Sequence, residues 1–326
     1  MALTLVLFIL GFVFLVKGAD LLVDGSSSIA KKYGLSSIMI GLTIVAFGTS
    51  LPELIVSVIA ATGGSSDIAI GSIIGSNFSN TLLILGITAL VTPLVIKKST
   101  VNKEIPLSLL AIFAVGILVN DLILNGISPN GLARIDGLIL LLFFVIFIYY
   151  TFGLSREKKN KLPNLKLIED REIKKHNNWL SAGMIVVGLV GLYFGGIWIV
   201  DGATEIARLF GLSEVLIGLT IVAVGTSLPE LAASIMAARK GQMDMAMGNV
   251  IGSNIFNLLW ILGLSASIFP ISYNPALNID IIILIAITIL LFPLIYGGRK
   301  NVLTKKEGAI LLVLYLAYLV FVAIRG

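Results

Sequence analysis

Two glutamates lie inside apolar stretches that are nearly identical to each other. GLTIVAFGTSLPEL at 41–54 recurs as GLTIVAVGTSLPEL at 218–231, and the copies differ only where Phe47 is replaced by Val224. Glu53 is the one acidic residue of the first copy and Glu230 that of the second. An uncompensated charge inside a membrane helix costs at least about 2.5–3.5 kcal/mol and usually marks function. Two such carboxylates require positive charge between them, either protons or metal cations.

Hydroxyl and amide side chains recur three or four residues apart around each glutamate and in the next apolar segment, so they share helix faces. In the first copy they are Thr49, Ser50, Ser57, Ser72, Ser76 and Asn80. In the second copy they are Thr226, Ser227, Ser234, Asn249, Ser253 and Asn257. The apolar segments contain no His or Cys, so every available ligand is an oxygen. Such ligands suit hard cations such as Ca²⁺ and disfavour transition metals.

A proline stands beside each glutamate. Pro52 and Pro229 cannot donate to the carbonyls of Gly48 and Gly225 four residues earlier, and glycine there lets the helix bend or unwind. Freed carbonyls at membrane depth are tolerated only where they line a cavity or bind an ion. The sequence therefore predicts a broken helix with main-chain ligands in each copy.

Membrane helices are the elements that must hold these residues. Hydrophobic residues make up 57% of the 326 residues, charged residues 13%, and the mean hydropathy is +1.05. This composition predicts an all-α polytopic membrane protein and leaves no room for a separate soluble domain. The first apolar segment lacks a basic leader, so it is interpreted as a span and not as a signal peptide. The ten predicted spans are Leu3–Ile29, Ser36–Ala61, Ile68–Leu90, Ile105–Val119, Leu132–Phe152, Trp179–Ala207, Glu214–Ala238, Met245–Ile268, Ile279–Tyr296 and Glu307–Ala323.

Basic residues segregate to one side of this arrangement. Of the 23 Lys and Arg, 19 fall on one side, three on the other (Arg134, Arg208 and Arg325), and Lys17 lies inside a span. Because positively charged loops stay in the cytoplasm, both termini are expected to be extracytoplasmic and the connector cytoplasmic. The protein is thus expected to be a multi-pass protein of the cell membrane, and its net charge of +5 gives no reason to expect nucleic acid as a partner.

The chain is an internal duplication. Aligning 11–90 with 188–267 gives 43 identical positions out of 80 without a gap. The predicted organisation is a first five-helix repeat at 1–154, a cytoplasmic connector at 155–178 and a second repeat at 179–326. Five is odd, so the second copy enters the membrane from the opposite side, and the ten helices form two inverted-topology repeats. Secondary transporters have this arrangement, with the substrate site between the halves near the membrane midplane.

Four motifs in order and in register identify a family. GTSLPE at 48–53 and 225–230, GSIIGSNFSN at 71–80 and GNVIGSNIFN at 248–257 resemble the two α-repeats of the calcium/cation antiporter superfamily. The specific likeness is to its sodium/calcium exchanger branch of prokaryotic type, and it covers the whole ten-helix chain.

The resemblance implies four adjacent cation sites at the membrane centre. The matching calcium positions are Glu53 and Glu230 with the carbonyls of Thr49 and Thr226. The matching sodium positions are Ser50, Ser76, Ser227 and Ser253 with the carbonyls of Ala46 and Ala223. The matching amide positions are Asn80 and Asn257. The family mechanism is alternating access, in which the first and sixth helices slide over the other eight; Gly11, Gly18, Gly25, Gly188, Gly195 and Gly202 would give these helices a small-residue sliding face.

Asn257 bears on the coupling, because in the superfamily that this chain resembles, potassium-dependent exchangers and some prokaryotic relatives carry Asp there. Two carboxylates are neutralised by one Ca²⁺ but carry +1 with three Na⁺, which predicts electrogenic, K⁺-independent exchange. The expected partners are Na⁺, Ca²⁺ and the lipid bilayer, with no cofactor, no enzymatic activity and a functional monomer. Proton coupling stays open because a glutamate pair can exchange protons. A passive cation channel is the alternative from another class, disfavoured because channel pores usually form between subunits.

Some repeated polar residues have simpler roles. Asn77 and Asn254 are expected to brace the helices, and Asp67 and Asp244 to cap helix N-termini. Asp24 and its repeat partner Asp201 are expected to cap helices or to pair with basic loop residues.

Overall fold

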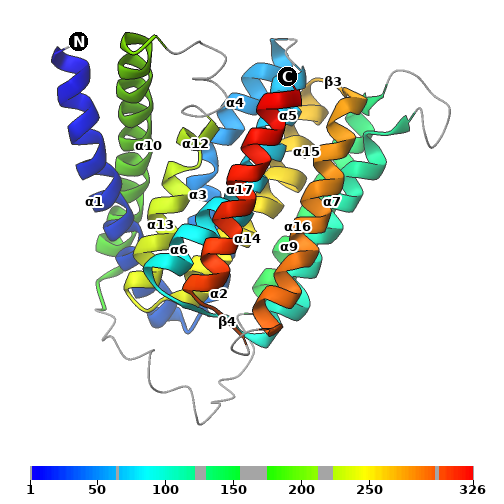
Figure 1. Cartoon of the computed structure of the whole chain (residues 1–326). Coiled ribbons are helices and arrows are strands. Elements are labelled where there is room, and N and C mark those ends of the chain that lie inside the picture. The colour runs from blue at the N-terminus through cyan, green and yellow to red at the C-terminus, as the bar shows by residue number, and fades with distance from the viewer. Residues whose placement is uncertain are drawn as a thin grey trace.

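The chain folds into a bundle of helices (Figure 1). The computed structural model describes residues 2–63, 66–121, 130–154, 175–211, 223–297 and 301–325. Two helices of 32 residues each, α1 (Ala2–Tyr33) and α10 (Asn178–Leu209), lie side by side at one edge of the bundle. The other elements in chain order, with η marking π-helical segments and the 3₁₀ helix η6, are α2 (Ser37–Ile40), η1 (Gly41–Val45), α3 (Ala46–Thr49), α4 (Leu51–Thr62), α5 (Ser66–Phe78), η2 (Ser79–Ile84), α6 (Leu85–Val91), β1 (Leu94–Val95), η3 (Thr100–Glu104), α7 (Ile105–Leu118), β2 (Gly131–Leu132), α9 (Arg134–Leu154), α12 (Ala223–Gly225), α13 (Leu228–Arg239), α14 (Met243–Ile255), η5 (Phe256–Ile261), α15 (Leu262–Ile268), β3 (Ile271–Ser272), η6 (Pro275–Leu277), α16 (Asn278–Gly297), β4 (Val302–Leu303) and α17 (Lys305–Arg325).

The described residues contain nine candidate membrane spans. Eight are continuous helical stretches, and α2–α4 together make a ninth that is bent by 49°. The remaining predicted span, Glu214–Ala238, is described only from α12 onward, because its first part lies outside the described residues. The expectation of an all-helical polytopic membrane protein is confirmed, and the total of ten spans stays a prediction.

Helix α1 runs past its predicted end at Ile29 as far as Tyr33. Lys31 and Lys32 occupy its last turn, where positive charge complements the helix dipole. The chain leaves the helix at Gly34, whose φ of 66° is readily adopted only by glycine. The glycine after the helix, and not the end of the apolar run, therefore marks where this helix ends.

Glycines bring α1 and α10 into close contact. A Cβ on Gly18 would lie 2.7 Å from the carbonyl oxygen of Gly188, and a Cβ on Gly195 would lie 2.8 Å from that of Gly11. All six glycines that were expected to form a sliding face have their nearest neighbours on the partner helix, α10 for those of α1 and α1 for those of α10. That expectation is corrected: the small residues join α1 and α10 into one unit, because only glycine allows the backbones to approach so closely.

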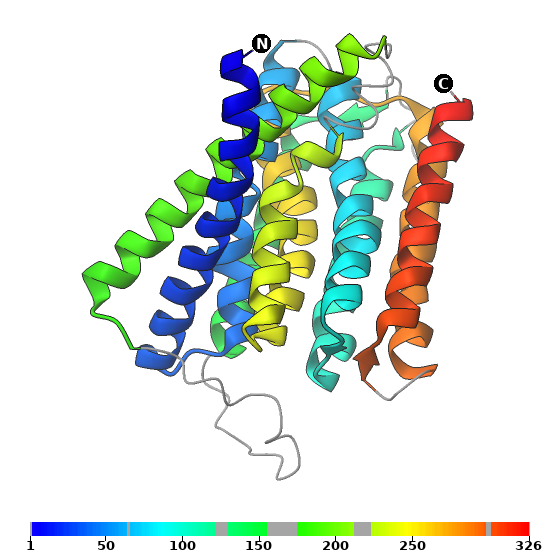
Figure 2. The same ribbon diagram turned by 60° about the vertical axis from the view of Figure 1, so that its left-hand side comes forward.

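The helices that carry the second pair of motifs lie inside the bundle. In the spans 69–91 and 243–268, 78% of the most apolar window is buried, against 17–39% in the other continuous spans. Helices α7, α9, α16 and α17 lie on the outer side of this interior layer (Figure 2). Large apolar side chains such as Leu142 of α9 and Leu316 of α17 are exposed, as a lipid-facing surface requires.

Equivalent elements of the two halves exchange partners. Strand β1 pairs with β4 through Leu94 and Leu303, and β2 pairs with β3 through Leu132 and Ile271. Each ribbon thus joins the segment after the third span of one half to the segment before the last span of the other. Helices do the same: a Cβ on Gly86 of α6 would lie 3.0 Å from the oxygen of Gly308 in α17, and α15 packs against α9 through another glycine pair. These reciprocal contacts support the predicted twofold relation between the halves.

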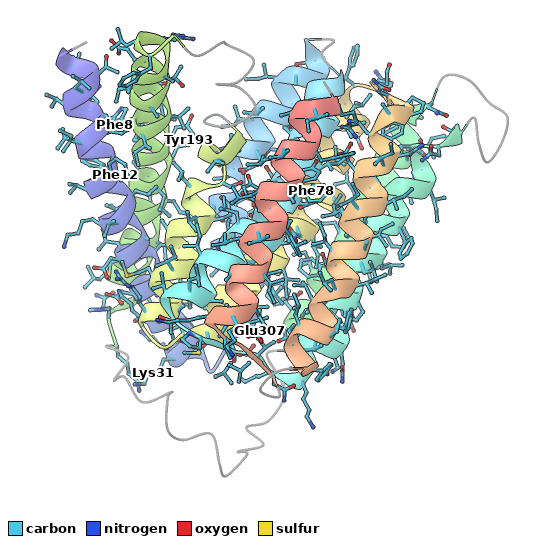
Figure 3. All side chains as sticks on the ribbon, in the orientation of Figure 1. Phe8, Phe12, Lys31, Phe78, Tyr193 and Glu307 are labelled. Carbon is cyan, nitrogen blue, oxygen red and sulfur yellow. The ribbon has the colours of Figure 1, made fainter. Side chains whose placement is uncertain are left out.

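Both chain ends lie at one end of the molecule (Figure 1). Lys31 and Glu307 lie at the opposite end (Figure 3). The ribbon of β1 and β4 is also found there, whereas β2 and β3 pair near the termini. An even number of crossings would give this placement of the termini.

The contact between α1 and α10 predicts a position-dependent effect of alanine. Gly188→Ala places a Cβ 2.7 Å from the oxygen of Gly18, and we expect it to destabilise the protein by about 1–3 kcal/mol through overpacking. Gly183→Ala on the same helix adds its Cβ where no atom lies within 4 Å, so it should leave the melting temperature unchanged or raise it. Thermal unfolding in detergent compares the two variants; equal melting temperatures would contradict the packing role of Gly188.

Candidate cation-binding site

Both copies of the repeated sequence contain a helix break at the residue before Leu-Pro-Glu. Ser50 separates α3 from α4 with φ −87° and ψ 8°, and Ser227 precedes α13 with φ −89° and ψ 3°. The new helix then begins with Leu-Pro, and proline is tolerated in a first turn because the N–H it lacks has no helical acceptor. The breaks predicted from Pro and Gly are therefore present. Ser50 lies between α3 and α4, and Thr226 and Ser227 lie between α12 and α13.

The two glutamates are buried, and their charges interact. Glu53 of α4 is 4% exposed, Glu230 of α13 is 1% exposed, and the charge of Glu230 acts on Glu53. Ser50 Oγ donates to Glu230 Oε1 across the halves at 3.1 Å, and Ser76 lies within hydrogen-bonding reach of Glu53. Among the described residues, no Lys, Arg or His forms an ion pair with either carboxylate. The pair thus lacks an internal counter-charge within the described part of the chain.

Several oxygens around this pair have no hydrogen-bond partner among the described residues. A buried polar atom left in this state costs about 1–3 kcal/mol, so a ligand that satisfies several at once gains considerably. Six of them belong to residues expected in the site from the sequence. They are Glu53 Oε2, Glu230 Oε2, Ser227 Oγ, Ser253 Oγ, Asn80 Oδ1 and Asn257 Oδ1.

The main-chain candidates lie at the breaks. Ala46 begins α3, and its carbonyl accepts the N–H of Ser50 at 3.0 Å and lies 3.4 Å from the hydroxyl of Thr49. Ala223 begins α12, and Thr226 lies between α12 and α13, half-buried. The hydroxyl of Thr49 lies 3.1 Å from the carbonyl of Val45 and 3.2 Å from Asn249 Oδ1, and its single proton can be donated to either acceptor.

Asn80 and Asn257 both occupy the second residue of a π-helical segment, η2 and η5. A π-helical turn shifts the side chains that follow it relative to an α-helix and is often found at functional sites. The sequence analysis missed these segments, because the apolar spacing on either side continues a helical period and no residue type marks the extra residue.

The structure adds Asn249 to the candidate site. Its side chain is fully buried and contacts Thr49 of the other half, with 3.2 Å between Thr49 Oγ1 and Asn249 Oδ1. It also donates to the main-chain oxygen of Glu230 at 3.2 Å. The sequence showed Asn249 on the polar face but gave no sign that it would reach across to the first break.

The expected bracing by asparagine is observed. Asn254 Nδ2 donates to Thr81 Oγ1 at 2.9 Å, which links α14 to η2, and Asn257 Nδ2 donates to Asn77 Oδ1 at 3.4 Å. These bonds hold the two interior helices together beside the glutamates.

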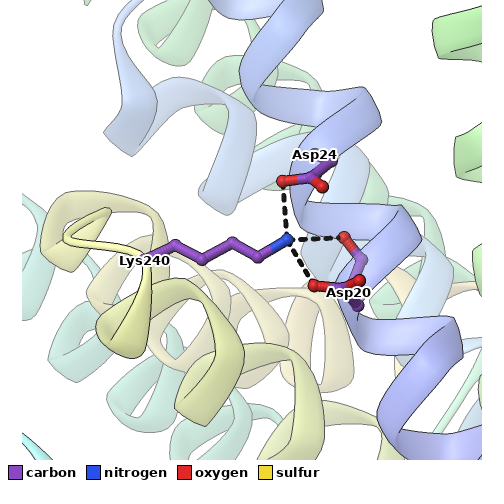
Figure 4. Close-up of polar contacts among 3 residues, drawn as sticks. All are labelled: Asp20, Asp24 and Lys240. Atoms are coloured by element: carbon purple, nitrogen blue, oxygen red, sulfur yellow. Dashed lines mark hydrogen bonds and ion pairs between the residues drawn. The ribbon is translucent and has the colours of Figure 1, made fainter. Parts of the chain in front are cut away.

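The repeated aspartates divide into different roles. Asp24 pairs with Lys240, a basic residue at the turn between α13 and α14, as its default role predicted (Figure 4). Asp244 does not cap α14, because Gln242 occupies the N-cap and Asp244 forms an ion pair with Lys97. That prediction is corrected: a lysine across the turn offers the carboxylate a stronger partner than a helix N–H. The side chain of Asp67 lies outside the described residues, and Asp201 lines a cavity.

This arrangement can bind hard cations. It combines two carboxylates with hydroxyl, amide and carbonyl oxygens, which is the ligand chemistry of Ca²⁺ and Na⁺. The described residues contain no group of three or more His, Cys, Asp and Glu side chains, so the fixed negative charge is that of the glutamate pair.

Comparison with known proteins assigns the chain to a family. The family model described as sodium/calcium exchanger protein matches residues 3–153 and 180–324. The chain is 38% identical to the putative antiporter CaxA of Alkalimonas amylolytica, with 95% of each chain covered. It is 32% identical to the sodium/calcium exchanger MaX1 of Methanosarcina acetivorans, with 96% of each chain covered.

A solved structure shows the same fold. A structure of the sodium-calcium exchanger NCX_Mj matches with a TM-score of 0.82 and 30% identity, covering 100% of this chain and 99% of that one. Family, relatives and fold agree with the motifs and with the buried glutamate pair. The chain belongs to the sodium/calcium exchanger family and is a membrane antiporter of its prokaryotic type.

Proposed function

We propose that this protein exchanges Na⁺ for Ca²⁺ by alternating access, with both ions bound between Glu53 and Glu230. The observation that carries the proposal is that one carboxylate from each half is buried beside the other, with no basic partner among the described residues. Such a pair is stable in an apolar interior only with cations or protons bound. The carrier changes between its two access states with ions bound, because the glutamate pair without bound ions has the higher free energy.

The ligands proposed for each ion are those that the resemblance to the sodium/calcium exchangers implies. Ca²⁺ lies between the two glutamates and takes the carbonyls of Thr49 and Thr226. Na⁺ ions use the hydroxyls of Ser50, Ser76, Ser227 and Ser253 together with the carbonyls of Ala46 and Ala223. The amide oxygens of Asn80 and Asn257 complete the cluster, and both are buried without a hydrogen-bond partner among the described residues.

Charge balance makes the exchange electrogenic. Two glutamates carry −2, which one Ca²⁺ neutralises and three Na⁺ overcompensate to +1. Asn257 adds no third charge, so the cycle needs no K⁺. No covalent chemistry and no cofactor enter this cycle, and one chain supplies both halves of the site, so a monomer suffices.

The same proposal sets the orientation. The end that carries Lys31 faces the cytoplasm, and both termini face the outside of the cell membrane. It is supported by the excess of basic residues in the loops on that side of the predicted spans.

Removal of either carboxylate should stop transport. Glu53→Gln and Glu230→Gln keep side-chain volume but remove the charge that holds Ca²⁺, and we expect Na⁺-driven ⁴⁵Ca²⁺ uptake into proteoliposomes to fall at least about a hundredfold, as the loss of a charged, buried ligand implies. Glu104→Gln is the matched control, since Glu104 is also buried (1% exposed) but is bonded to Tyr150 outside the site. Unchanged uptake in both site variants, with melting temperatures like that of the parent, would contradict the assignment.

The driving ion and the charge moved are measured in the same vesicles. An outward Na⁺ gradient should drive Ca²⁺ uptake without K⁺, and a valinomycin-set potential should change its rate, because net charge crosses in each cycle. Uptake driven equally by a proton gradient in Na⁺-free vesicles would favour the proton-coupled alternative. Uptake without any counter-ion would indicate a channel. A rate that does not depend on the potential would exclude the three-for-one stoichiometry.

A further inference from the structure

The two halves differ at a buried position next to the glutamates. Asn249 of α14 corresponds in the repeat to Ser72 of α5. Ser72 Oγ donates to the carbonyl of Ala69 within its own helix at 3.1 Å. Asn249 instead reaches three groups on other helices: its Nδ2 donates to Ser234 Oγ at 2.9 Å and to the carbonyl of Glu230 at 3.2 Å, and its Oδ1 accepts from Thr49 Oγ1 at 3.2 Å.

An amide is the side chain that can make these contacts together. It has two N–H donors and a separate acceptor oxygen, whereas a hydroxyl has a single proton to donate. Asn249 therefore ties the break at Thr49 to the backbone at Glu230. These two residues come from different halves, and both are proposed calcium ligands.

We propose that Asn249 is a positioning residue for Ca²⁺. By fixing the separation between the Thr49 and Glu230 ligands, it favours the binding of Ca²⁺ over that of Na⁺. A divalent ion with several carboxylate and carbonyl ligands gains most from ligands that are already in place. The flanking serines proposed for Na⁺ receive no hydrogen bond from Asn249. The inference rests on the proposed function, because it assigns to Ca²⁺ the ligands that Asn249 holds.

The substitution Asn249→Ser converts the position to its repeat counterpart. The half-saturating Ca²⁺ concentration for uptake should rise on the order of tenfold, the equivalent of one or two lost hydrogen bonds, while the half-saturating Na⁺ concentration changes less than about twofold. Ser72→Ala is the matched control in the other half, and both values should stay near those of the parent. Thr49→Val removes the hydroxyl that lies 3.2 Å from Asn249 Oδ1, so the half-saturating Ca²⁺ concentration should also rise.

The positioning role would be overturned if Asn249→Ser shifted the half-saturating concentrations of Ca²⁺ and Na⁺ equally, or if Ser72→Ala shifted them as much as Asn249→Ser does. Either result would indicate that Asn249 has a general packing role. The parent protein separates this outcome from a failure of the proposed function: absence of Na⁺-driven Ca²⁺ uptake in the parent would reject the exchange itself.

A second inference comes from different contacts, at the end of the molecule that carries Lys31. Lys240 follows α13, and its Nζ lies 2.5 Å from Asp20 Oδ1 and 2.6 Å from Asp24 Oδ1 (Figure 4). It also donates to the carbonyl of Asp20 at 3.0 Å. One lysine thus ties α1 to the turn between α13 and α14 through three contacts.

The opposite end of the long helix pair is built differently. The repeat counterpart of Lys240 is Gly63, which has no side chain to offer, and the counterpart of Asp24 is Asp201. Asp201 lines a cavity of about 680 Å³ between the start of α1 and the end of α10, together with Thr4 and Thr204. The lysine contact that ties one end of the α1 and α10 unit to the bundle therefore has no counterpart at Gly63, and at the other end a cavity lies between α1 and α10 themselves.

We infer that Lys240, Asp20 and Asp24 form an electrostatic latch that holds this end of the α1 and α10 unit closed against the bundle. Because glycines pack α1 tightly on α10, the two helices move together, and access from this end requires the latch to open. Its charge pairing biases the carrier toward the conformation that is closed here.

The chain has no cysteine, so single-cysteine reporters need no background substitutions. Ser27 of α1 is 4% exposed and lies close to Asp24 in the sequence, so a cysteine there should react with a water-soluble thiol reagent only when this end opens. In the Ser27→Cys background, Lys240→Gln should raise the labelling rate several-fold, whereas Lys240→Arg, which keeps the charge, should not. Equal labelling of the Gln variant and the parent would overturn the latch.

Cross-linking gives an independent measurement. Asp24→Cys with Lys240→Cys, joined by a reducible bifunctional thiol reagent, should lose Ca²⁺ uptake and regain it on reduction. Ser28→Cys with Ser181→Cys is the matched control, because Ser181 Oγ donates to Ser28 Oγ at 2.9 Å between α1 and α10, which move as one. Full uptake in the cross-linked first pair would contradict the proposed opening.

Discussion

The burial of two like charges in an apolar interior is the constraint to which the rest of this structure responds. Carboxylates at 4% and 1% exposure have lost nearly all their water, and each raises the energy of the other. Protein donors stabilise them only in part: Ser50 and Ser76 each offer one proton, and one oxygen of each glutamate lacks a partner among the described residues. In the proposed cycle cations complete the balance, so the ion would be a structural requirement of the site as well as its cargo.

That constraint explains the local irregularities. An intact α-helix uses its carbonyls internally and offers an ion only side chains. Breaks at Ser50 and Ser227 and π-helical segments at Asn80 and Asn257 bring main-chain and amide oxygens toward the same region. These four departures from regular helix lie at or next to residues proposed as ion ligands.

The sequence predicted the parts of this structure that are encoded by residue type and repetition. Composition and hydropathy predict membrane helices, and Pro52 with Gly48 predicts the first break. The duplicated motifs identify the family. The assignment of individual ions to individual ligands comes from the resemblance to the family, because residue type alone does not distinguish a calcium ligand from a sodium ligand.

Features that depend on which helix faces which could not be predicted from one sequence. The spacing of the glycines predicted a small-residue face for sliding, but only the packing shows that Gly18 and Gly188 face each other within the helix pair. The sequence predicted that Asp244 caps a helix, but the fold places Lys97 beside it. Lys240 contacts Asp24 of α1, which lies 216 positions away in the sequence. The π-helical segments have no residue signature at all.

The exchanged ribbons bear on how such a chain arose. β1 pairs with β4 and β2 with β3, and the helix contact of Gly86 with Gly308 is mirrored by that of Gly263 with Gly137. Each of these contacts joins one half to the other, so a five-helix ancestor would have left its own strands unpaired. Two copies inserted in opposite orientations would have satisfied all of them as an antiparallel homodimer. Gene fusion then needed only a connector, and it freed positions such as Asn249 and Lys240 to diverge from their counterparts.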